Sequence, residues 1–247
     1  MIRGHESVES NGSIAISRVL TLDHLRAFWT SQTQPQQRVV VFDGPEERKF
    51  ESNLQCFSNF HKQPEFQFIV PEYLCSDRMQ LQARERTVMC AFSEMAIMLC
   101  KAAVMGDLDS YWRIARAKRP DEAKHYGRQV KGFDQKRWEK VVCAVAFHLV
   151  YEKFVQTPEL QDSLLATGSS FIAEANDKVW GNGLRKGDER ELMPCQWRGS
   201  NVRWALMETR DSLRRLRALK LYTTTAQGSP RDPHGELRGK LNGYPRG

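Results

Sequence analysis

The sequence contains no C-x-x-C pair, no apolar leader and no uncharged hydrophobic run long enough to cross a membrane. Its six cysteines are separated from one another and do not cluster with histidine, which excludes the usual ligand spacing of a zinc site. Several lie in apolar segments, as free buried thiols do. We therefore expect an intracellular, reducing compartment, either cytoplasm or nucleus, with no disulfides and no metal. The polar N-terminus, MIRGHESVESNGS, predicts neither secretion nor a membrane anchor.

The composition is that of one globular domain. The 247 residues are 40% hydrophobic and 27% charged, and this length can bury a full-sized core. The net charge of +7 favours an anionic ligand but does not by itself establish nucleic-acid binding.

Local patterns predict a mainly α fold with a small β element near the N-terminus. Short strands are expected at 38–42 (RVVVF) and 66–70 (FQFIV), from their β-branched and aromatic residues. From about residue 87 onward the pattern is helical. The expected helices cover 88–105, 107–117, 121–131, 135–154, 157–168 and 202–221, with a short one possible at 19–29.

These elements divide the chain into three parts. Residues 1–35 are predicted to form a partly flexible N-terminal extension, and 36–221 a single catalytic domain. Residues 222–247 are rich in Gly and Pro and poor in aliphatic residues, so a disordered C-terminal tail is expected.

The segment 89–105, MCAFSEMAIMLCKAAVM, is apolar except for Glu94 and Lys101. Seven residues make nearly two helical turns, so both side chains leave the same face, about 10 Å apart along the axis. That separation is too long for an i,i+4 salt bridge. Either each charge pairs with a neighbouring helix, or both line a cavity, where burial raises the pKa of the carboxyl group and lowers that of the amine.

Residues 171–184, FIAEANDKVWGNGL, place Trp180 beside Gly181 and Gly183. Glycine lets a backbone approach a ligand closely, and tryptophan is a natural stacking surface for a base. The segment lacks the third glycine and the preceding strand of a dinucleotide-binding loop, so no such loop is predicted. A turn around a core tryptophan explains the same residues.

Two further stretches contain groups that suit phosphate. Arg128 follows a helix end expected at Gly127, and its guanidinium group matches phosphate geometry. A solvated surface arginine is the alternative. Ser200 and Asn201 of WRGSN stand at the start of the last helix, where free backbone N–H groups bind anions. An ordinary helix cap explains these two residues equally.

Six segments of the chain occur in a distinctive order. They are FSNF (57–60), SEMAIMLCKA (93–102) with GD (106–107), AKHYGRQVKGFDQKRW (123–138), KFVQTPELQDSLLATG (153–168), EANDKVWGNGL (174–184) and WRGSN…LMETR (197–210). Together they resemble the NADAR (YbiA-like) family over residues 57–216. Each segment is weak alone, but six in the right order are specific. The resemblance implies a compact, single-domain, mostly helical fold that hydrolyses N-glycosidic bonds.

The resemblance also implies which residues form the site. Glu94, Lys101, Trp138 and Asp177 match the family's catalytic positions. Ser58, Asn59, Arg128, Trp180, Gly181, Gly183 and Asn201 match positions expected near the ligand. The chain departs from the family pattern at Met95, Ala96 and Ile97, and again at Arg203 and Trp204. These departures affect the choice of substrate more than the reaction.

Family activities fall into two groups. One removes ADP-ribose from guanine in nucleic acid or nucleotides, and the other cleaves phosphorylated ribosylamino-pyrimidine intermediates of riboflavin synthesis. The forms MxxxKA…GD and GRQVKGFD…W resemble the first group more closely. The implied partner is therefore an ADP-ribose-containing ligand, carried by DNA or RNA. An ADP-ribose reader that has lost catalysis is the alternative from another class. No cofactor is implied, and the oligomeric state is left open.

The expected reaction is cleavage of a C–N bond at the anomeric carbon of ribose. Glu94 would stabilise the electron-poor carbon or take a proton from a ribose hydroxyl. A neutral Lys101 would capture the ring-opened sugar as a Schiff base, which water then hydrolyses. Asp177 would transfer a proton or hold the ribose, and Trp180 or Trp138 would stack on the base.

Overall fold

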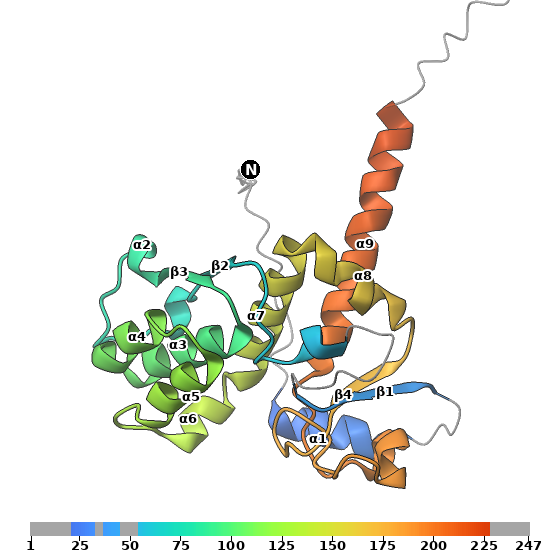
Figure 1. The fold of residues 1–247 in the computed structure, drawn as a ribbon, viewed down its shortest axis with the longest axis horizontal. Helices are drawn as coiled ribbons and strands as arrows, with labels where there is room; N and C mark the ends of the chain where they lie inside the picture. Colours follow the sequence, from blue (N-terminus) through green and yellow to red (C-terminus); the bar gives the residue numbers. More distant parts are fainter. Residues whose placement is uncertain (1–20, 33–36, 45–53, 228–247) are drawn as a thin grey trace, which may run out of the picture.

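The computed structural model describes residues 21–32, 37–44 and 54–227, and helices dominate them (Figure 1). The α-helices are α1 (Leu22–Ser31), α2 (Ala83–Arg86), α3 (Ser93–Met105), α4 (Leu108–Ala115), α5 (Pro120–Arg128), α6 (Gln135–Glu139), α7 (Val142–Gln156), α8 (Pro158–Ala166) and α9 (Trp204–Gln227). Short 3-10 helices are η1 (Leu54–Phe57), η2 (Glu72–Leu74), η3 (Glu189–Leu192) and η4 (Pro194–Gln196). The strands are β1 (Val39–Phe42), β2 (Phe66–Ile69), β3 (Thr87–Cys90) and β4 (Phe171–Glu174). The predicted mainly helical fold with a small β component is confirmed.

The strands form two separate pairs. β1 runs parallel to β4, with Val39 opposite Phe171, and β2 runs antiparallel to β3, with Phe66 opposite Cys90. The two expected strands are therefore confirmed, whereas their partners were not predicted. Residues 87–90 were expected to begin a helix. They are extended instead because β2 supplies the backbone hydrogen bonds, and the helix begins only at Ser93.

β4 also corrects the expectation that no strand precedes the Gly-x-Gly segment. The first three residues of β4 are all buried and apolar. The segment therefore lacks the alternation of apolar and polar residues that is typical of a half-exposed strand. The loop that follows carries Asp177 and Trp180 out of the sheet.

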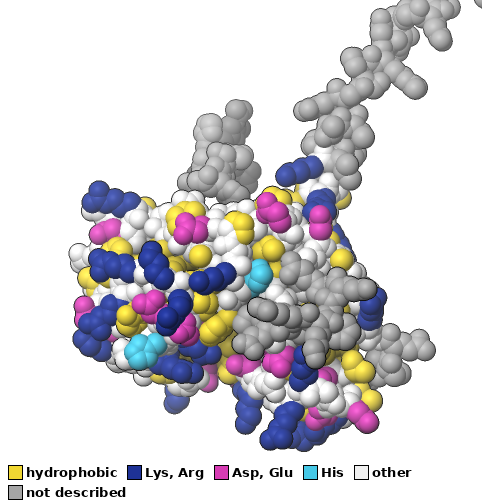
Figure 2. Space-filling model, viewed as in Figure 1, with side chains coloured by type: hydrophobic (Ala, Val, Ile, Leu, Met, Phe, Trp, Pro, Cys, Tyr) yellow, Lys and Arg dark blue, Asp and Glu magenta, His cyan; other side chains and the backbone are white. Residues whose placement is uncertain are grey.

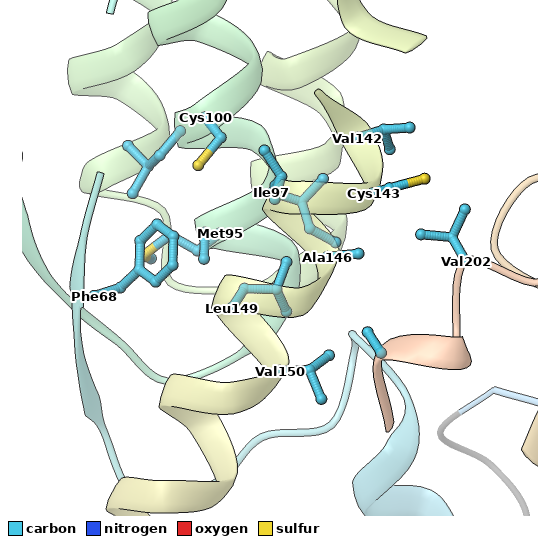
Figure 3. Close-up of a cluster of buried hydrophobic side chains, with 14 of the residues drawn as sticks. Phe68, Met95, Ile97, Cys100, Val142, Cys143, Ala146, Leu149, Val150 and Val202 are labelled. Atoms are coloured by element: carbon cyan, nitrogen blue, oxygen red, sulfur yellow. The ribbon is translucent and has the colours of Figure 1, made fainter. Parts of the chain in front are cut away.

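Helix α7 lies at the centre of the molecule and contacts both α3 and α9 (Figure 1). The helices α2 to α6 lie on one side of it, and α8, α9 and the β1–β4 pair lie on the other. Between α3 and α7, Ile97 packs close to Ala146 and Leu149 (Figure 3). The core therefore packs α3 against the central helix α7.

Helix α3 is buried along almost its whole length, which explains its nearly unbroken apolar sequence. It ends at Gly106, whose φ of 75° is a left-handed conformation that favours glycine. On one side α5 packs closely against it at Gly127, where a Cβ atom would lie 1.9 Å from the Met98 sulfur atom. This glycine lies within α5, which continues to Arg128, and not at the helix end that the sequence suggested.

Two further boundaries differ from the sequence-based expectation. The single helix expected over 135–154 is two helices, because α6 ends at Glu139 and α7 begins at Val142. No Gly or Pro marks this break. Helix α9 extends to Gln227, so the first part of the expected disordered tail is helical. The remainder, 228–247, lies outside the described residues, as do residues 1–20 of the expected flexible extension.

Helix α1 belongs to the folded body. Trp29 is 1% exposed, its Nε1 donates a hydrogen bond to the Ser200 carbonyl at 3.1 Å, and its ring contacts Trp197 and Phe171. Thr21 caps the helix by accepting from the backbone N–H of His24. All six cysteines are free thiols. Within the described ranges, no helix combines the length and apolar character that a membrane span requires.

Candidate active site

A cavity of about 350 Å³ lies between α3, α5, α6 and the loop after β4. Its wall includes several residues singled out from the sequence, namely Lys101, Arg128, Trp138, Asp177 and Trp180. Val179 and Leu22 of α1 complete one side. Segments far apart in the sequence thus converge on one hollow, and the volume lies within the usual range for small-molecule sites.

The Lys101 side chain is half-buried on this wall. Its Nζ lies 4.2 Å from the centre of the Phe133 ring. Burial lowers the pKa of this amine, the charge of Arg128 lowers it further, and Glu94 opposes both effects. A lowered pKa increases the fraction of neutral, nucleophilic amine at neutral pH.

Glu94 lies two turns before Lys101 on the same helix and is only 5% exposed. Burial raises the pKa of its carboxyl group to about 7, although the positive charges of Lys124, Arg203 and Arg128 act in the opposite direction. Its backbone N–H donates to the Asn59 carbonyl at 3.0 Å, while its carboxylate accepts no hydrogen bond from any described residue. Unlike Lys101, Glu94 is not part of the cavity lining, although Lys124 and Arg128, whose charges lower its pKa, do line the cavity.

The loop after β4 presents Asp177 and Trp180 to the cavity. One Asp177 oxygen accepts the backbone N–H groups of Val179 and Trp180, both at 2.7 Å. The carboxylate therefore shapes the turn that carries the tryptophan, while the Asp177 side chain itself is exposed and lines the cavity. Trp138 reaches the same hollow from α6, so two indole rings border it.

Residues 42–214 match the sequence profile of the NADAR domain. The match covers well over half of the chain. The chain belongs to the NADAR family. The described part of this NADAR chain contains no cluster of His, Cys, Asp and Glu side chains suited to a metal ion.

Individual relatives agree with this assignment. The NADAR chain is 33% identical to N-glycosidase R617 of Acanthamoeba polyphaga mimivirus over 112 residues, which cover 44% of this chain and 66% of that protein. It is 32% identical to Protein irg-1 of Caenorhabditis elegans over 124 residues, which cover 49% and 58% of the two chains. The chain thus spans less than two thirds of the length of these relatives.

A solved structure supports the same fold. The NMR structure of the Escherichia coli protein YbiA superposes with a TM-score of 0.52, at 24% identity, over 74% of this chain and 89% of that one. At this identity the likeness concerns the fold alone.

Arg203, at a position where the chain departs from the family pattern, is a buried cation next to Glu174 and Asn59 that was not predicted from the sequence. The Arg203 side chain is 2% exposed. Its Nε and Nη2 both donate to one Glu174 oxygen, at 2.9 and 2.6 Å, and its Nη1 donates to the Asn59 side chain at 2.7 Å. The guanidinium group also lies 5.3 Å from the Trp180 ring. The departure from the family pattern was the only indication of this role in the sequence.

Gly181 and Gly183 have a packing role in the NADAR fold. A Cβ atom on Gly181 would lie 2.0 Å from the Glu174 carbonyl oxygen, and one on Gly183 would lie 2.7 Å from the Gly199 nitrogen. The close approach that these glycines permit is thus to neighbouring backbone. Neither glycine is part of the cavity lining.

Ser58 and Asn59 are buried and are not part of the cavity lining. The Ser58 hydroxyl accepts the Phe60 N–H, and its carbonyl accepts a hydrogen bond from Lys153, a buried lysine that the sequence analysis did not single out. Lys153 Nζ also donates to the Cys56 carbonyl at 2.6 Å. The lysine thus holds the turn that places Asn59 against Arg203 and Glu94.

The anion site suggested at Ser200 and Asn201 does not form. The N–H groups of Ser200, Asn201 and Val202 donate to carbonyl oxygens of residues 178, 181 and 179, so they are not free for an anion. Asn201 adopts a φ of 43° and its side chain donates to the Ile172 carbonyl. These residues anchor the loop that carries Trp180 to the start of α9.

Proposed function

We propose that this NADAR domain is an N-glycosidase that removes ADP-ribose from guanine in nucleic acid or nucleotides. The observation that carries the proposal is the cavity lined by Lys101, an amine whose pKa is lowered by burial, on the same helix face as a buried carboxyl group, Glu94. The printed name of the mimiviral relative, N-glycosidase R617, supports the same type of reaction.

Lys101 is the proposed nucleophile. When the ring oxygen leaves the anomeric carbon and takes a proton, the Lys101 nitrogen adds to that carbon. The C–N bond to the base then breaks, the base departs with a proton, and an imine joins the sugar to Lys101. Water adds to the imine, which releases the aldehyde form of the sugar and the free amine.

Glu94 acts in its ionised form in this scheme. Because Glu94 does not line the cavity, its negative charge stabilises the positive charge at the anomeric carbon without direct contact, and a water molecule relays a proton to it during hydrolysis of the imine. A carboxyl group with a pKa of about 7 exchanges protons efficiently near neutrality. Asp177 holds the ribose or relays a proton to the departing base, and Trp138 and Trp180 stack against the base.

The proposal predicts that Glu94→Gln and Lys101→Arg lower kcat on an ADP-ribosylated guanosine substrate by roughly 100- to 10,000-fold. Borohydride reduction of the reaction mixture would trap the sugar on wild-type protein. A Lys101→Ala variant that still forms the reduced adduct would remove Lys101 from this role. Lys140→Ala, at an exposed lysine outside the cavity lining, is the matched control.

The same assay distinguishes two other functions. Turnover of a phosphorylated ribosylamino-pyrimidine, without turnover of ADP-ribosylated guanosine, would assign the protein to riboflavin metabolism. Tight binding of ADP-ribose with no turnover of either substrate would make it a reader. Released ADP-ribose, detected by chromatography, is the result that the proposal expects.

A further inference from the structure

A second hollow, of about 720 Å³, lies along α5 next to the reaction cavity. We call it the α5 groove and define it by Phe60, Lys118, Arg119, Lys124, His125 and Arg128. Lys124 and Arg128 line both hollows, one helical turn apart on α5. A ligand that passes from the cavity into the groove therefore crosses two cationic side chains.

The groove is positively charged. Two carboxylates, those of Asp121 and Glu122, also line the groove, but both have partners within it. Asp121 forms a salt bridge with Arg119 at 2.9 Å, and Glu122 accepts the backbone N–H of Lys118 at 2.8 Å. Lys118, Lys124 and Arg128 form no salt bridge with any residue that the structure describes. Lys and Arg side chains gather over the half of the molecule that carries α4 and α5 (Figure 2). This arrangement favours an extended anion over a single charged group.

Phe60 adds a flat apolar surface to this charged groove. Lys124 Nζ lies 4.9 Å from the centre of its ring, and the ring is only partly buried. Cations that follow a phosphate backbone, combined with an aromatic ring on which a base stacks, are the usual components of a single-strand binding surface.

We propose that the α5 groove binds the sugar-phosphate backbone of a single-stranded nucleic acid whose modified base occupies the reaction cavity. This inference rests on the proposed function. A base must leave the duplex stack to enter such a cavity, which favours a single strand. Lys124 and Arg128 contact the phosphates nearest the reacting ribose. Lys118 and Arg119 lie outside the cavity lining and contact phosphates further along the strand, Arg119 through Nη1, because its Nε and Nη2 donate to Asp121.

The test measures binding of a fluorescent, unmodified single-stranded DNA oligonucleotide over a series of salt concentrations. The double variant Lys118→Gln/Arg119→Gln should raise Kd. It should also reduce the slope of log K against log salt by about 1.4, which is about 0.7 for each of two lost phosphate contacts. The matched control is Arg84→Gln/Arg185→Gln, which removes two exposed cations elsewhere and should change neither quantity. Thermal unfolding of each variant verifies that it is folded.

Turnover gives an independent readout. The double variant should raise KM for an ADP-ribosylated oligonucleotide and leave turnover of ADP-ribosylated guanosine unchanged. The inference is overturned if the wild-type protein does not bind the unmodified strand at low salt. It is also overturned if the double variant weakens binding of free ADP-ribose and leaves strand binding intact, because the groove would then hold the diphosphate of the ligand. Since the binding assay contains no ADP-ribose, its result is independent of whether the protein is an N-glycosidase.

Discussion

Arg203 joins Glu174, at the end of β4, to Asn59, in the turn after η1, through one buried guanidinium group. Asn59 in turn accepts the backbone N–H of Glu94 through its carbonyl. The positive charge of Arg203 is thus held beside the carboxyl group that we propose for catalysis, and it is one of the charges that lower the pKa of Glu94. The arginine therefore has both a structural and an electrostatic effect.

Arg203→Met should raise the pKa of Glu94 further above about 7, because burial would then act with less opposing positive charge. Since the ionised carboxylate is the active form, the acidic limb of kcat/KM should move to higher pH. The variant should also lose about 3–5 kcal/mol of stability, because Glu174 would lose its buried partner. The pH–rate profile and denaturant unfolding measure the two effects.

Arg203→Lys separates these effects. Lysine keeps the charge but cannot reproduce the three hydrogen bonds of the guanidinium group, so stability should fall while the acidic limb stays near its wild-type position. If Arg203→Met leaves the acidic limb unchanged, the electrostatic role of Arg203 is wrong.

Lys153→Met should change how stability depends on pH. Burial lowers the pKa of Lys153 to about 7, compared with about 10.5 in the unfolded chain. Between these values the unfolded state binds more protons than the folded state, so this lysine makes the folded protein more stable as the pH rises. Its contribution to the slope approaches about 1.4 kcal/mol per pH unit.

Urea unfolding at pH 7.5 and 8.5 would measure the Lys153 contribution as the difference in slope between wild type and variant. Cys56, whose pKa is raised from 9.0 to about 11 on folding, is present in both proteins, so its titration in the unfolded state largely cancels in this difference. Equal slopes for the two proteins would show that Lys153 remains protonated when buried.

The placement of Lys101 on the cavity wall was predictable because it depends on one helix. An i,i+7 spacing fixes the relative direction of Glu94 and Lys101 whatever surrounds them, and the strand at 87–90 shortened the helix without changing that spacing. Depth in the fold was not predictable in this way. Lys101 lines the cavity, whereas Glu94 is buried and does not.

The roles of residues that bond to partners far away in the sequence could not be predicted from local patterns. The partner of Arg203 at Asn59 is 144 positions away, and that of Lys153 at Cys56 is 97 positions away. No local pattern identifies such pairs. The same limitation applies to Gly181 and Gly183, whose neighbours are backbone atoms of other segments. The family resemblance pointed to Arg203 and the two glycines, but not to Lys153, and it did not reveal what any of them contacts.

Trp29→Ala should destabilise the whole domain if α1 is integral to it. The change removes a fully buried indole ring and its hydrogen bond to Ser200, with an expected cost of about 3–5 kcal/mol. Phe28→Ala is the matched control, because that neighbouring ring is 46% exposed and should cost about 1 kcal/mol. Equal, small losses in denaturant unfolding would mean that α1 is dispensable.

Gly127→Ala and Gly181→Ala should both destabilise the domain, but the atoms that the new methyl group meets are different. A second substitution, Met98→Ala, distinguishes the two cases. The new methyl group at Gly127 meets the flexible Met98 side chain, at a cost of about 1–3 kcal/mol, and Met98→Ala should recover most of that loss. At Gly181 it meets the Glu174 carbonyl oxygen at 2.0 Å, so no neighbouring side chain can relieve the clash. The loop that carries Trp180 must then move.

The Gly181→Ala variant should therefore be the least stable of the series and should lose activity as well. Gly187→Ala is the control for backbone conformation alone, because Gly187 has a φ of 85° and no atom lies within 4 Å of the position that a methyl group would take there. Its cost should be about 1–2 kcal/mol, from the left-handed conformation. Urea unfolding of the three variants and of Gly127→Ala/Met98→Ala measures each loss. If the double variant is no more stable than Gly127→Ala, contact between α5 and Met98 does not limit the packing of α5 on α3.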